Sequence, residues 1–79
     1  MITKQELIAR LKEDIRVEEA AIGLYTRPLK ETLQVSGLSD DQRKRLASLL
    51  DRLAEDSKTH ERVFTELLER VSRSDRDVY

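Results

Sequence analysis

Residues 36–42 read Ser36-Gly37-Leu38-Ser39-Asp40-Asp41-Gln42, and this stretch divides the chain into two long helical patterns. Gly37 can adopt the left-handed conformation that ends a helix. Ser39 and Gln42 have the spacing of a capping box, in which each side chain accepts a hydrogen bond from the other residue's backbone N–H. The acidic residues between them fit a first turn, where the helix dipole favours negative charge. The stretch therefore predicts a short connection, followed by a helix that begins near residue 40.

Both flanking segments carry a heptad pattern. Thr3 and Glu6 form a second capping-box pair, so we expect one helix over about 4–35 and another over about 40–73. Apolar residues recur in steps of three and four, as on a helix that packs along one seam. They are Ile8, Leu11, Ile15, Ile22, Tyr25 and Leu29 in the first segment, and Leu46, Leu50, Leu53, Phe64, Leu67 and Val71 in the second. Residues 74–79 lack the pattern and are expected to fray.

Pro28 interrupts the first pattern. Proline removes a backbone hydrogen bond and crowds the preceding turn, so the helix must either kink near residues 24–28 or break and restart. The apolar phase continues beyond the proline through Leu29 and Leu33, which favours a kink.

The chain is too short to bury a large core by itself. Its 79 residues are 38% hydrophobic and 39% charged, which limits residues 1–79 to a single domain with a marginal core. Apolar residues also flank both seams, and stripes of this width suit a helix that packs against two neighbours. We therefore expect an all-α fold, a two-helix antiparallel hairpin that dimerises into a four-helix bundle. Its partner would be itself, as a homodimer or a higher homo-oligomer.

Composition excludes several classes of function. Without cysteine the chain has no disulfide framework, zinc finger or thiol nucleophile. A net charge of −1 disfavours a nucleic-acid partner. No apolar run approaches the length of a membrane span, and the first residues lack the apolar region of a secretory signal. We expect a soluble, cytoplasmic protein with neither a nucleic-acid nor a membrane partner.

Three polar residues interrupt the apolar seams: Glu18 in the first segment, and Ser57 and His60 in the second. Burying a carboxylate costs several kcal/mol unless it is paired, protonated or bound to a metal. In a hairpin that is symmetric about residues 37 and 38, Glu18 lies level with Ser57, and His60 is displaced by about 4.5 Å along the axis. The three side chains are therefore predicted to meet at one level.

Glu18, Tyr25 seven residues later and His60 on the antiparallel helix resemble the half-bundle of the ferritin-like superfamily. The two-helix form resembles encapsulated ferritins, in which two chains assemble the bundle that rubrerythrins and ferritins make from one chain. The resemblance implies that Glu18 and His60 bind a metal across the dimer interface, with Tyr25 close to it. It implies iron, or another divalent metal, as the cofactor. It also implies a ferroxidase-type reaction with O₂, and a location in the cytoplasm or inside a protein compartment. Ser57 stands where the family's Glu-x-x-His motif has its glutamate.

The charge of the candidate ligands favours one metal ion over two. Two chains would contribute two carboxylates and two neutral imidazoles, which match one divalent ion in charge and number. A second ion would need Asp56, Glu19 or Glu61 to turn inward.

Two hypotheses for the function follow. The first hypothesis is a ferritin-like metal-binding protein with an inter-subunit site, possessing at most a degenerate ferroxidase. The alternative is a non-catalytic dimerisation or interaction module, in which Glu18 and His60 only fix the packing register.

Overall fold

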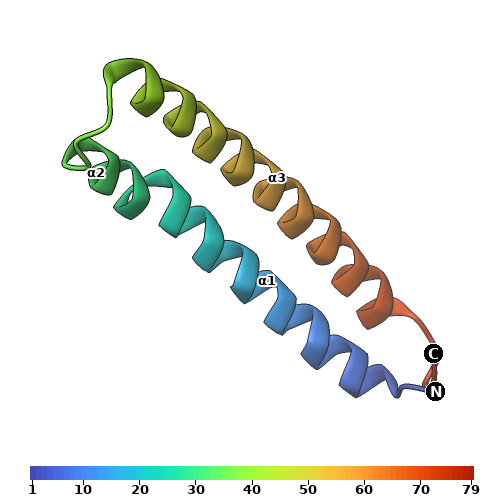
Figure 1. Cartoon of the computed structure of the whole chain (residues 1–79). Coiled ribbons are helices and arrows are strands. Elements are labelled where there is room, and N and C mark those ends of the chain that lie inside the picture. The colour runs from blue at the N-terminus through green and yellow to red at the C-terminus, as the bar shows by residue number, and fades with distance from the viewer.

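The chain folds into three helices that form two antiparallel arms. The computed structural model describes Met1–Tyr79 and contains α1 (Lys4–Thr26), α2 (Pro28–Gln34) and α3 (Asp40–Arg73). α1 and α2 follow one another along the first arm, and α3 forms the second (Figure 1). The arms lie side by side in a rod of 56 × 18 × 15 Å. The prediction of an all-α helical hairpin is confirmed.

Local sequence explains where the helices begin. The Ser39 hydroxyl accepts from the Gln42 N–H at 3.2 Å, and the Gln42 side chain accepts from the Ser39 N–H at 3.1 Å, so the capping box is complete. Gly37 has a φ of 72°, in the left-handed region that was predicted for it. At the first helix, Thr3 accepts from the Glu6 N–H at 3.1 Å, without the reciprocal bond from the Glu6 side chain.

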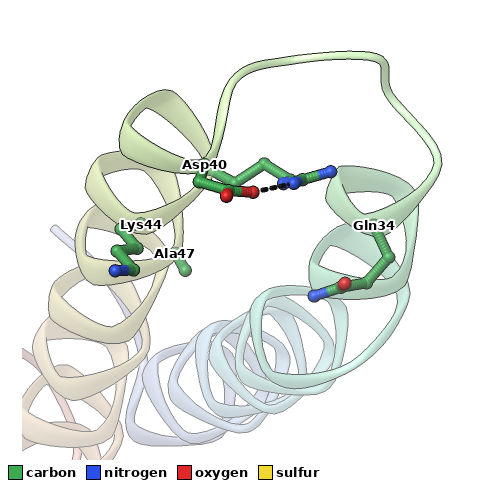
Figure 2. A pocket seen from close by; sticks show the side chains of 5 residues that line it. Gln34, Asp40, Lys44 and Ala47 are labelled. Carbon is green, nitrogen blue, oxygen red and sulfur yellow. Dashed lines mark hydrogen bonds and ion pairs between the residues drawn. The ribbon is translucent and has the colours of Figure 1, made fainter.

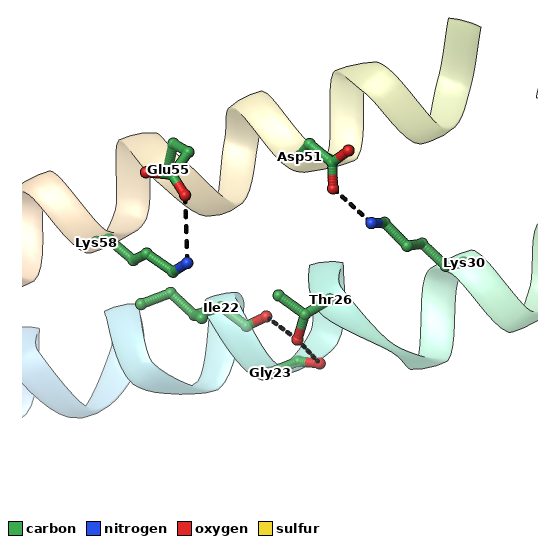
Figure 3. A network of polar contacts seen from close by, with 7 residues as sticks. All are labelled: Ile22, Gly23, Thr26, Lys30, Asp51, Glu55 and Lys58. Atoms are coloured by element: carbon green, nitrogen blue, oxygen red, sulfur yellow. Dashed lines mark hydrogen bonds and ion pairs between the residues drawn. The ribbon is translucent and has the colours of Figure 1, made fainter. Parts of the chain in front are cut away.

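Pro28 breaks the first arm instead of kinking a continuous helix. α1 ends at Thr26 and α2 starts at Pro28, and Arg27 between them has φ −134° and ψ −66°. Pro28 takes the first position of α2, where its missing N–H costs nothing because no partner carbonyl is required. The preference for a kink was therefore wrong. An ion pair between Lys30 and Asp51 attaches α2 to α3 (Figure 3).

Glu18 and His60 come from opposite arms and lie in contact. Between Glu18 and the turn, the first arm contains non-helical backbone at Arg27 and at its C-terminal end. A non-helical residue advances the chain by up to about 3.3 Å, against 1.5 Å in a helix. Arms with different amounts of non-helical backbone therefore need not pair in a strictly symmetric register.

The C-terminal tail is paired, in contrast to the expectation that residues 74–79 fray. Ile2 and Tyr79 exchange two backbone hydrogen bonds of 2.9 and 2.7 Å, and the Lys4 N–H donates to the Asp77 carbonyl at 2.8 Å. The Arg76 guanidinium lies 5.0 Å from the centre of the Tyr79 ring. An antiparallel hairpin brings its two termini to the same end (Figure 1), so their free backbone groups can bind one another.

The core between the arms is thin. Only four of the 79 residues are buried, namely Leu11, Ala54, Ser57 and Val71. The radius of gyration is 17.4 Å, whereas a compact chain of this length has about 12 Å. Two helices bury one seam each, and the remaining apolar surface stays exposed. None of the helices combines the length and the apolar character needed to cross a membrane.

Candidate functional site

Glu18 of α1 and His60 of α3 form the one ion-pair contact between side chains of the two long helices. Oε1 of Glu18 lies 3.4 Å from Nδ1 of His60. The Glu18 side chain is 17% exposed and the His60 side chain 59% exposed. This pairing of a carboxylate with an imidazole agrees with the sequence prediction that the two residues meet.

The heptad positions explain the difference in exposure. Glu18 is seven residues from the buried Leu11, so two helical turns place it on the line that faces α3. His60 is three residues after the buried Ser57 and is therefore rotated by about 60° from the corresponding line on α3. Glu18 points between the helices, and His60 stands at one margin of their contact.

The arrangement suits a metal-binding imidazole. When the Nδ1–H of a neutral histidine points toward a carboxylate, the lone pair remains on Nε2. In many metal sites, a carboxylate behind the imidazole fixes the orientation of the ring. The 3.4 Å separation is slightly longer than an ordinary N–H···O hydrogen bond. Glu18 can thus serve either as a direct ligand or as the group that orients His60.

No hydrogen bond or ion pair links the other predicted site residues to this pair. Ser57 is buried. Tyr25 shares the face of Glu18, about 10 Å further along α1, and is partly exposed. Asp56 and Glu19 are exposed, and Glu61 is partly exposed. Nowhere in the chain do three or more histidine and acidic side chains converge as a metal site requires. One chain therefore supplies two candidate ligands.

A polar hollow, separate from the Glu18–His60 pair, lies at the turn end of the hairpin. Gln34, Asp40, Arg43, Lys44 and Ala47 line an open depression of about 300 Å³ (Figure 2). Arg43 is paired with Asp40 in an ion pair within α3. The hollow is shallow, and its arginine is already neutralised, so it offers no evident chemistry.

No family model, curated protein or solved structure matches this chain. The ferritin-like resemblance therefore stays a prediction that rests on Glu18, Tyr25 and His60.

Proposed function

We propose that this chain is half of a four-helix bundle, which pairs with a second copy and binds a divalent metal ion between the copies at Glu18 and His60. The observation that supports this function is the contact between a mostly buried carboxylate and a histidine that is still half-exposed. A pair of this kind is incomplete as a metal site in one chain and can be completed by its symmetry mate.

Electrostatics favours a cation at this position. Glu18 has no lysine or arginine partner, and His60 is its one ion-pair contact. Covering the pair with a second chain would remove the remaining water from both carboxylates, at a cost of several kcal/mol unless a positive charge compensates. One divalent ion balances two Glu18 carboxylates, and two His60 nitrogens complete a four-coordinate site.

Asp56 is a source of additional carboxylate ligands for metal ions. It lies one helical turn before His60, so that both side chains project from the same side of α3. Two copies of Asp56 would raise the number of carboxylates from two to four. Without them, Ser57 leaves too few ligands for a di-iron pair, and the proposed activity is metal binding and not iron oxidation.

Metal analysis tests this function. Protein purified without added metal is analysed for its metal content, and the metal-free protein is then titrated calorimetrically with Zn²⁺ and, without oxygen, with Fe²⁺. We expect one tightly bound ion per two chains. His60→Ala and Glu18→Gln should remove it, while Glu19→Gln, at the neighbouring exposed carboxylate, should leave it intact. Equal metal binding by all three variants would contradict the proposal.

The Glu18–His60 contact also favours a second candidate function, a metal-independent interaction module. In that case the pair aligns the helices through its own hydrogen bond. His60→Ala would then lower the melting temperature by the same amount with and without metal. A metal site instead predicts a difference that exists only in metal-loaded protein.

A further inference from the structure

One face of the hairpin is apolar and uncovered. Five aliphatic side chains of the two long helices are between 41% and 58% exposed. They are Val17 and Leu24 on α1, and Leu49, Val63 and Leu67 on α3. Together they are called the open face below.

Helical geometry places these five side chains on the same side of the rod. At about 100° per residue, Val17 is rotated by roughly 120° from the buried Leu11, and Val63 by roughly 120° in the same sense from the buried Ser57. In two antiparallel right-handed helices, equal rotations away from the shared seam lead to the same face. The opposite rotation leads to Lys12 and Thr65, which are exposed. The hairpin thus has one apolar and one polar face.

The open face continues a second heptad along α3. Leu49, Leu53, Asp56, His60, Val63 and Leu67 follow one another in steps of four, three, four, three and four residues. A heptad of this length is typical of a helix that packs against another helix. The sequence alone shows that the apolar surface of α3 is wider than one seam. The heptad from Leu49 to Leu67 can be assigned to the open face only once the structure shows which side of α3 faces α1.

The exposed area has the size of a dimer interface. The chain exposes 6086 Å², whereas a compact monomer of 9.2 kDa exposes about 4,900 Å². The difference is about 1,200 Å², and a standard protein–protein interface buries about 800 Å² on each partner. A second copy on the open face would therefore cover most of the excess surface.

We infer that the open face packs against the open face of a second copy, around a two-fold axis that passes close to Glu18 and His60. This inference rests on the proposed function for the existence of a second copy, and adds the surface and the position of the axis. Glu18 lies near the middle of the first arm, which spans residues 4–34. With the axis at this level, the rods of the two copies lie against each other along nearly their whole length. It also brings both Glu18–His60 pairs together.

Thiol protection tests the surface. The chain has no native cysteine, so Val63→Cys and Thr65→Cys each introduce one reactive thiol, two residues apart on opposite faces. Maleimide labelling is measured over a range of protein concentrations, with the mass of the assembly followed by light scattering. On dimerisation, the Val63→Cys thiol should react about tenfold or more slowly, whereas Thr65→Cys should keep its rate. Leu67→Cys and Glu69→Cys form a second matched pair, in case one substitution prevents folding.

Labelling of Val63→Cys and Leu67→Cys at the rate of their controls, in samples that are dimeric, would overturn the inference. A chain that stays monomeric at every concentration would overturn it as well. Metal content is measured in the same samples. A protected open face without bound metal would sustain the inference while refuting the metal site. One bound ion per dimer with an unprotected open face would sustain the metal site and refute the inference about the open face.

Discussion

Replacing Val63 by aspartate should disrupt the dimer while the hairpin itself remains helical. Val63 is 47% exposed in the single chain. Complete burial of a valine side chain contributes about 1.5 kcal/mol, so covering the remaining half contributes roughly 0.7 kcal/mol per copy. The symmetric interface contains the residue twice, and losing both valines weakens dimerisation by about 1.4 kcal/mol, or tenfold.

The introduced carboxylate weakens the dimer further. Burial of a polar group without a partner costs about 1–3 kcal/mol in proteins, and two copies add about 2–6 kcal/mol. Together with the lost apolar contact, Val63→Asp should raise the dimer dissociation constant by about 300-fold or more. Sedimentation equilibrium measures this constant, and far-UV circular dichroism reports whether α3 is intact.

Thr65→Asp is the matched control for this experiment. It places the same carboxylate two residues away on the polar face, where the side chain is exposed. Its dissociation constant should stay within a factor of about three of the original, since exposed substitutions change stability by about 0.5 kcal/mol. Equal weakening by both substitutions, or none by Val63→Asp, would refute the assignment of the open face.

Three further predictions concern the metal, the backbone and the tail. Ser57→Glu should raise bound iron, measured by mass spectrometry, toward two ions per dimer, and should make the melting temperature depend more strongly on metal than that of the unchanged chain, because the position is buried. Gly23→Ala should stabilise the chain by about 0.5–1 kcal/mol in urea unfolding at one protein concentration, while Gly37→Ala should destabilise it by about 1–2 kcal/mol. An added methyl group meets nothing within 4 Å at either position, so only backbone conformation distinguishes them. Removing residues 77–79 should accelerate hydrogen exchange at the Lys4 amide, which donates to Asp77; unchanged exchange would mean that the terminal pairing contributes nothing.

Local signals in the sequence predicted the helix ends because the responsible interactions span only a few residues. The Ser39–Gln42 capping box and the positive φ of Gly37 are properties of the backbone and its nearest side chains. Pro28 was less predictable. There the choice between a kink and a break depends on one residue, Arg27, whose conformation the apolar periodicity does not constrain.

Long-range features were predictable only in part. The meeting of Glu18 and His60 follows from two interrupted heptads, but the exact register depends on how much non-helical backbone each arm contains. The pairing of Ile2 with Tyr79 involves main-chain atoms alone. No side-chain pattern can reveal it, and the charged tail sequence indicated fraying instead.

The polar pair also bears on how two copies would align. Within one chain, the covalent turn fixes how α1 and α3 face each other, but nothing covalent fixes one copy against another. The heptad row on α3 would permit a slip of seven residues with similar apolar overlap. Such a slip would place Glu18 and His60 against aliphatic side chains, at a cost of several kcal/mol for each carboxylate. Only one alignment lets both pairs meet and share a cation. A polar interruption that weakens the apolar seam would therefore select a single dimer, and the alignment it selects is the one that builds the proposed metal site.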